Sequence, residues 1–403
     1  MKIAKISLLI KDAILALSGI FFSTIVAKGL DNREAAAVFL TLASFNFSKS
    51  FLKSRVVEFW LIKGSDKVLT PNQFYFGLSY ETFSRFIALG IFHFSSMAVG
   101  SDYLSSLIYW LIAFSMLIDI PFIIVRYSLR AKEDYTFLSI VSLIPGLSMI
   151  VGSAGVLFFD FRYFLVVLCV LLVPSVINFS ISAFYLYYNF VFPKFTASSG
   201  KDLAGIFLSE KDYFVWGSVR SLIAEPLKSG FLLIAGVFSS SSEVVILRFA
   251  VHAASIGQRA LSALRPYIFN RVLTVQHSGA VVFEWRLLFV SLLLSALVFL
   301  LYVIHFSTAL LDDANMVVVL GLVYCGCIAI SNATNKVAMA SLIEGRSKRY
   351  VILMIAPVVL FGSLLGIAVL SSTHVILAYF AFFSLYLSSS LVQILTRREN
   401  FFW

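Results

Sequence analysis

Two stretches decide how the chain is interpreted: GSVRSLIAEPLKSGFLLIAGVF at residues 217–238 and EVVILRFAVHAASIGQRALSAL at residues 243–264. Each is long and apolar enough to cross a bilayer as an α-helix. A helix surrounded by lipid normally contains no ionisable side chains, because hydrocarbon does not solvate them. Both stretches do contain such side chains, namely Arg220, Glu225 and Lys228 in the first and Arg248, His252 and Arg259 in the second.

The polar residues of the second stretch share one face. They are spaced by four, three, four and three residues, and an α-helix turns by about 100° per residue, so they form a narrow stripe. A guanidinium in the middle of the bilayer costs roughly 2.5–3.5 kcal/mol, so such residues normally face a bundle interior or a water-filled cavity. We therefore predict a cationic, water-accessible cavity around which the chain is organised. The stripe consists of Arg248, His252, Ser255, Arg259 and Ser262.

A structural role for these charges is the alternative. Long basic side chains can extend along a helix to the lipid headgroups. Glu225 and Lys228 are three residues apart, a spacing at which opposite charges pair on a helix. For this pair the structural interpretation is favoured, while Glu225 is also a candidate ion-coupling residue.

The composition is that of a membrane protein. Of the 403 residues, 60% are hydrophobic and 13% are charged, whereas about 25% are charged in a typical soluble domain. The net charge of +10 does not indicate a nucleic-acid partner, because the basic residues lie mainly in short loops, where topology and anionic lipid explain them. The sequence contains no glycine-rich nucleotide loop and no cluster of metal-ligand residues, and its three cysteines lie in apolar stretches. We expect no cofactor, no metal site and no enzymatic activity.

Hydropathy divides the chain into about twelve transmembrane helices. We therefore predict an all-α integral membrane protein with an N-terminal six-helix bundle at residues 1–190, a cytoplasmic linker at 191–213 and a C-terminal six-helix bundle at 214–403. Residues 54–75 are expected to form one of the longest connections. The predicted spans are 9–29, 34–53, 76–98, 104–125, 136–158, 163–189, 214–237, 243–266, 286–307, 314–337, 350–371 and 374–396.

Basic residues alternate strongly between the two sides of these spans. The side of the N-terminus has 22 Lys and Arg residues, whereas the opposite side has only Lys28, Arg33 and Arg162. Because basic loops are retained in the cytoplasm, we predict that both termini are cytoplasmic.

The two halves of the chain resemble each other. SGIFFSTIVAKGLDNREAAAVFLTLASF begins at Ser18 and SGFLLIAGVFSSSSEVVILRFAVHAASI begins at Ser229, and the acidic starts of the following spans lie 209 residues apart. Six spans plus six spans predict a parallel repeat about an axis along the membrane normal. The residues 209 positions before Arg248 and His252 are Phe39 and Ala43, so we expect the two bundles to bind unequally.

Other spans add polar residues to the predicted inner surface. Asn332 and Lys336 share one face of the tenth span, and both are candidate substrate contacts. On the second span, Asn46 and Lys49 follow a helical spacing toward the cytoplasmic end.

The third and fourth spans contain acidic residues. Glu81 and Arg85 are four residues apart, which predicts a structural ion pair. Asp119 stands shortly before Pro121, and a proline frees backbone carbonyls within a helix. Asp119 is therefore a candidate proton or cation site, and a capped, kinked helix is an equally good interpretation.

These features together resemble a known family. Twelve spans in two halves, the start of the eighth span, SSEVVILRFAV, and the turn after the tenth, ASLIEGRSKRY, are similar to the Wzx-type flippases of O-antigen and other polysaccharides. Those flippases belong to the MATE-like multidrug/oligosaccharidyl-lipid/polysaccharide exporter superfamily. The resemblance covers nearly the whole chain, although this sequence has no counterpart of the two extra C-terminal spans of the lipid II flippases. A peptidoglycan precursor is therefore a weaker candidate substrate.

The resemblance implies two bundles arranged as a V, with a central lumen that opens to either side in turn. It also implies a bacterial inner-membrane protein that moves an O-antigen or capsular repeat unit, linked to undecaprenyl pyrophosphate, from the cytoplasmic to the periplasmic leaflet. A polysaccharide polymerase and a chain-length regulator are the implied protein partners. By position, the family's cationic lumen matches Arg220, Lys228, Arg248, Arg259 and Lys336, to which His252 and Asn332 are added as candidate substrate contacts.

Two other functions fit part of the pattern. A multidrug exporter of the same fold would favour an acidic cavity for cationic drugs, whereas the deep charges here are mostly basic. An integral-membrane glycan polymerase usually needs a sizeable external domain, and the predicted external loops are short. The flippase interpretation is therefore preferred.

Overall fold

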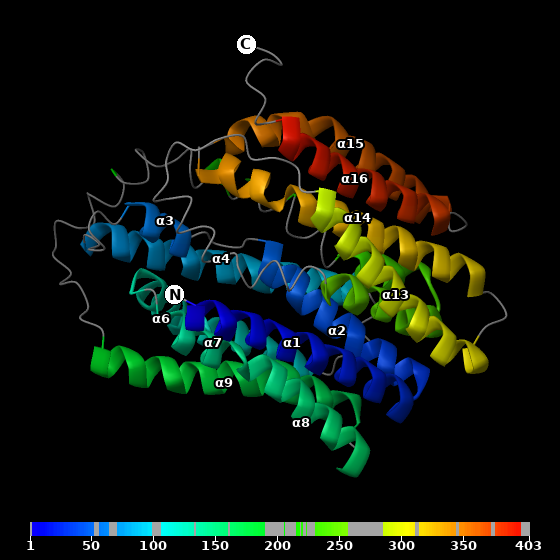
Figure 1. Cartoon of the computed structure of the whole chain (residues 1–403), viewed down its shortest axis with the longest axis horizontal. Helices are drawn as coiled ribbons and strands as arrows, with labels where there is room; N and C mark the ends of the chain where they lie inside the picture. Colours follow the sequence, from blue (N-terminus) through cyan, green and yellow to red (C-terminus); the bar gives the residue numbers. More distant parts are fainter. Residues whose placement is uncertain are drawn as a thin grey trace.

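The structure, a computed structural model, consists of α-helices joined by short connections in the part that it describes (Figure 1). That part comprises residues 2–51, 56–63, 71–98, 106–132, 134–159, 162–189, 205, 215–217, 219–220, 223, 230–256, 285–310, 314–343, 346–371 and 375–395. Lys228, Arg259 and Glu225, which were predicted as site residues, lie outside these residues.

The helices follow the apolar stretches of the sequence. A further helix without a label in Figure 1 occupies residues 241–256 and is called helix 241–256 below. The labelled helices are α1 (Lys2–Gly29), α2 (Asn32–Phe51), α3 (Val56–Lys63), α4 (Pro71–Ala98), α5 (Ser106–Ile118), α6 (Ile120–Ala131), α7 (Tyr135–Ser142), α8 (Ile144–Phe159), α9 (Tyr163–Asn189), α11 (Gly230–Phe238), α13 (Trp285–Leu310), α14 (Ala314–Ile343), α15 (Ser347–Ser371) and α16 (Val375–Leu395).

Eight helical stretches in the described residues are long and apolar enough to cross a membrane, so the chain is a multi-pass membrane protein. The predicted second and third spans form α2 and α4, which are too polar to meet the same criterion, and the seventh and eighth are described only in part. Twelve crossings therefore stay a prediction. The eight stretches are Ile10–Gly29, Tyr109–Ala131, Tyr135–Phe159, Tyr163–Asn189, Leu288–His305, Met316–Thr334, Ser347–Ser371 and Val375–Leu395.

The connection predicted at residues 54–75 is wrong in part, because it contains α3 and the start of α4. The anchor of α3 is Trp60, which is fully buried and stacks on Phe74 with ring centroids 5.4 Å apart. Its indole N–H donates to the carbonyl oxygen of Gln73 at 2.9 Å. This burial stabilises a helix that is too short to be stable alone.

The helices of each half pack mainly on one another. In the first half, α1 packs against α7 and α8, and α9 packs against α8, α5 and α2; in the second, α14 packs against α13 and α16. The two halves meet where α2 packs on α11, and one apolar core contains residues of both. In Figure 1 the N-terminal end of α1 and the C-terminal end of α16 lie at the same (left) end of the bundle, as expected if both termini share one side.

Two helices that are equivalent in the predicted repeat begin with similar caps. Asp31 caps α2 by accepting a hydrogen bond from the backbone N–H of Glu34 at 2.7 Å. Helix 241–256 begins with Ser240, which accepts from the N–H of Glu243 at 3.4 Å, while the Glu243 carboxylate accepts from the N–H of Ser240 at 2.7 Å. Both caps satisfy backbone N–H groups of a first helical turn. They lie 209 residues apart, the offset of the sequence repeat.

Candidate functional site

The predicted cationic stripe begins at the contact between the two halves. Arg248 and His252 lie one turn apart on helix 241–256, and both side chains are buried, with 7% and 4% of their surface exposed. The Arg248 guanidinium lies 5.5 Å from the centre of the Phe39 ring on α2. Phe39 is also the residue 209 positions before Arg248. In the predicted repeat, equivalent positions that contact each other lie near the axis that relates the halves, which would put Arg248 close to that axis.

Further contacts link the halves at the end of the bundle that is predicted to be periplasmic. Lys28, near the end of α1, lies 2.6 Å from Nε2 of His305 on α13. One turn earlier on each helix, the hydroxyl of Tyr302 forms a side-chain hydrogen bond with Thr24. These contacts hold α1 and α13 together at this end.

The inner face of α2 is covered at one end and accessible farther along. Phe39 and Asn46 are seven residues apart and therefore point within about 20° of the same direction. Phe39 is fully buried and contacts Arg248, whereas Asn46 is exposed. Lys49, one turn beyond Asn46, keeps 34% of its side chain exposed. The face that meets the other half near Phe39 is thus polar and accessible toward the end predicted to be cytoplasmic.

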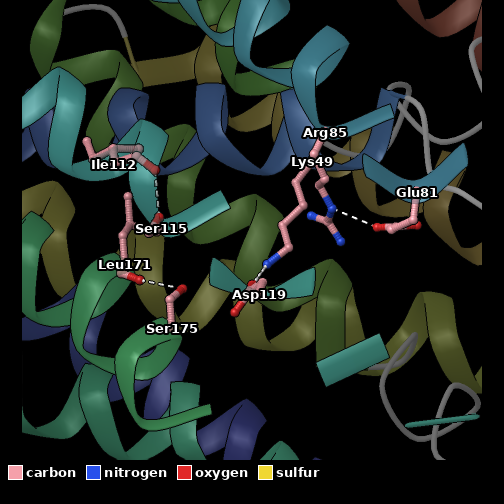
Figure 2. Close-up of polar contacts among 8 residues, drawn as sticks. All are labelled: Lys49, Glu81, Arg85, Ile112, Ser115, Asp119, Leu171 and Ser175. Carbon is pink, nitrogen blue, oxygen red and sulfur yellow. Dashed lines mark hydrogen bonds and ion pairs between the residues drawn. The ribbon is translucent and has the colours of Figure 1, made fainter. Parts of the chain in front are cut away.

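Four charged residues gather beside this face in the first half (Figure 2). Lys49 on α2 forms an ion pair with Asp119, which lies between α5 and α6. On α4, Nε of Arg85 donates to Oε1 of Glu81 at 2.7 Å, which confirms the predicted pair. Glu81 is also within electrostatic reach of Lys49 and of Arg126 on α6. We call Lys49, Glu81, Arg85 and Asp119 the four-charge cluster.

The backbone break at Asp119 was predicted, but the role of its side chain differs from a helix cap. Asp119 occupies the N-cap position of α6, with Pro121 in the first turn, yet its side chain makes no capping hydrogen bond. Its Oδ2 instead binds Lys49, and its buried Oδ1 has no hydrogen-bond partner in the part that the structure describes. The neighbouring Ser115 and Ser175 donate to carbonyl oxygens of their own helices (Figure 2). The kink therefore directs a carboxylate toward α2.

Two other predicted site residues lie within the second half. Arg220 is almost fully buried, with its guanidinium carbon 4.7 Å from the centre of the Tyr350 ring on α15. Asn332 on α14 donates to the hydroxyl of Ser291 on α13 at 2.9 Å. Both contacts lie within the second half. Lys336 lies in α14, but its side chain is outside the described part.

The structure therefore places Arg248, one turn from His252, against Phe39, and it places Lys49 against Asp119. The pairing of Lys49 with Asp119 was missed, because 70 residues separate them and nothing local connects them. Among the described residues, no group of three His, Cys, Asp or Glu side chains is placed to hold a metal ion. The chemistry open to this surface is ionic and hydrogen-bonding recognition.

Comparisons with known proteins add little to this geometry. No protein-family model and no curated protein matches the chain. Among solved structures, the chain is similar to the eukaryotic MATE transporter AtDTX14, with a TM-score of 0.49, 10% identity and coverage of 97% of this chain and 93% of that one. It is also similar to a MATE in complex with Br-NRF, with a TM-score of 0.42, 11% identity and coverage of 98% and 93%. Both TM-scores are too low for the likeness to assign a fold family or an activity.

Proposed function

We propose that the chain is a MATE-like flippase for a polysaccharide repeat unit linked to a polyprenyl diphosphate, moved from the cytoplasmic to the periplasmic leaflet by alternating access. The observation that carries this proposal is the pair Arg248 and His252, buried on one face of helix 241–256 at the contact between the halves. Opening that contact would present two basic groups to the space between the bundles.

The chemistry of such a substrate requires fixed cations. A diphosphate and a chain of sugar hydroxyls lose their hydration when they leave water, and that loss is large for the charged group. Arginine and histidine donate charge-assisted hydrogen bonds that offset it, and buried serines, asparagines and tyrosines can bind hydroxyls. The polyprenyl tail is apolar and can stay in the bilayer throughout.

The buried carboxylates of the first half favour a second candidate, an exporter of cationic small molecules. Glu81 and Asp119 are both buried. Each is bound to a basic residue, Arg85 and Lys49 respectively, so the four-charge cluster has no net negative charge for a cationic drug. The flippase is therefore the better-supported proposal.

A deletion strain separates the two candidates. Without the flippase, intact lipid-linked repeat units should accumulate in the cytoplasmic leaflet and surface polysaccharide should disappear, and the wild-type chain should restore display. Cells that express the chain should at the same time show unchanged sensitivity to lipophilic cations such as ethidium. Normal polysaccharide display in the deletion strain, combined with ethidium resistance when the chain is expressed, would contradict the flippase and support the exporter.

A further inference from the structure

The ion pair between Lys49 and Asp119 is unequally buried. The Lys49 side chain keeps 34% of its surface exposed, whereas Asp119 keeps 9%. The lysine side chain is therefore partly accessible beside α2, whereas the carboxylate is not. A lysine has three donors on a flexible stem and can turn from one anion to another with little rearrangement of its helix.

The position of Lys49 complements that of Arg248. The first half has Phe39 and Ala43 where the second has Arg248 and His252. On α2 the polar face opens only at Asn46 and continues to Lys49. An anion bound between the halves would thus meet the basic groups of the second half near the axis and a lysine of the first half farther toward the cytoplasmic end.

The four-charge cluster contains a second cation besides Lys49. Figure 2 shows two ion pairs in this cluster, Lys49 with Asp119 and Arg85 with Glu81, and Glu81 is within electrostatic reach of Lys49 as well. Buried Nη1 of Arg85 and Oδ1 of Asp119 have no hydrogen-bond partner in the described residues. Within the described part, the cluster therefore holds a second cation with an unused donor, Arg85, and a carboxylate oxygen without a partner, Oδ1 of Asp119.

We infer that Lys49 is the contact of the first half for the diphosphate of the transported lipid, and that Asp119 is the counterion that it exchanges for that diphosphate. This inference rests on the proposed function for the class of ligand. It assigns a binding role to Lys49, which was not among the residues of the predicted cationic lumen. It also predicts that Lys49 increases the affinity for the diphosphate and that Asp119 decreases it.

The test is binding of farnesyl diphosphate, with farnesol and inorganic diphosphate as separate arms, to the purified full-length chain in detergent. Lys49→Gln should weaken binding by about tenfold, because one charge-assisted hydrogen bond is lost. Asp119→Asn should tighten binding, because Lys49 no longer has to leave a carboxylate. Lys49→Arg should keep most of the affinity, and the double variant Lys49→Gln with Asp119→Asn should bind as weakly as Lys49→Gln alone.

Lys132→Gln is the matched control, because Lys132 is an exposed lysine at the C-cap of α6. This variant should bind farnesyl diphosphate with the same affinity as the wild type. Equal affinity losses in Lys49→Gln and Asp119→Asn would overturn the inference and leave a purely structural pair. Equal affinity of the wild type for inorganic diphosphate and farnesyl diphosphate would make free diphosphate the ligand and overturn the assignment to a lipid. The binding measurements decide the role of Lys49, and the deletion-strain test decides whether the chain is a flippase. Failure of one is therefore distinguishable from failure of the other.

Discussion

Helix α2 and helix 241–256 are built alike and carry different chemistry. Both begin with a side-chain cap at positions 209 residues apart, and both pack at the contact between the halves. Yet α2 presents Phe39 where its counterpart presents Arg248. The two helices therefore share a backbone arrangement but differ in side chains. Helix 241–256 supplies the buried cation, and α2 supplies the aromatic ring that contacts it.

The energetic terms of this contact are unequal. A cation–π contact contributes roughly 0.5–2 kcal/mol, whereas taking a guanidinium out of water costs several kcal/mol even after the protein relaxes. The Phe39 ring alone therefore does not offset the burial of Arg248. Other contacts of Arg248 must supply the rest, and Tyr324 on α14 lies within its electrostatic reach.

The largest expected effect is the loss of Arg248. Arg248→Ala should abolish surface polysaccharide without loss of the chain from the membrane, and Arg248→Lys should retain part of it, because the charge is the main requirement. Polysaccharide display in the deletion strain, with membrane levels measured in parallel, checks this. Full display by Arg248→Ala at a normal membrane level would mean that the two equivalent helices do not differ in function.

The buried pair of α4 should show a large effect on stability. Glu81→Gln leaves Arg85 beside a neutral partner, and breaking a buried ion pair typically costs about 3–5 kcal/mol. Glu81→Gln combined with Arg85→Gln should recover most of that loss. Thermal midpoints in detergent report the difference. If the double variant is no more stable than Glu81→Gln, the pair is not the reason for the destabilisation.

A smaller effect should follow from Phe39→Leu. Leucine keeps an apolar side chain at this fully buried position but removes the ring, so the free energy of unfolding should fall by about 2 kcal/mol. Phe39→Tyr, which keeps the ring, is the matched variant. The comparison of the two midpoints isolates the contribution of the aromatic face, and identical midpoints would mean that Arg248 gains nothing from the ring.

The smallest effects should come from the caps, where the two helices are alike. Asp31→Ala and Ser240→Ala should each lower the free energy of unfolding by about 1 kcal/mol, the usual value of an N-cap. Hydrogen exchange of the first turn of each helix should increase locally. A loss confined to one of the two helices would contradict the equivalence that the 209-residue offset indicates.

Much of the fold follows from the sequence, because it depends on local and periodic information. Apolar runs of about 20 residues predict helices that cross a bilayer, and eight such helices are present in the described part. The pair of Glu81 and Arg85 was predictable, since both residues lie on one turn of the same helix. The repeat also predicted that α2 and helix 241–256 are equivalent, although it did not predict that they touch.

The site itself was decided by the tertiary structure. Lys49 and Asp119 are 70 residues apart, and Phe39 and Arg248 belong to different halves, so their contacts depend on how each helix is rotated about its axis. A hydropathy pattern determines which face of a helix is apolar, but it leaves open which polar residue of another helix that face will meet. The packing of large side chains sets that rotation, as Phe231 does by stacking on Tyr324 with ring centroids 4.2 Å apart. For this reason composition and periodicity determine the number and character of the helices, and only their packing decides which charges meet.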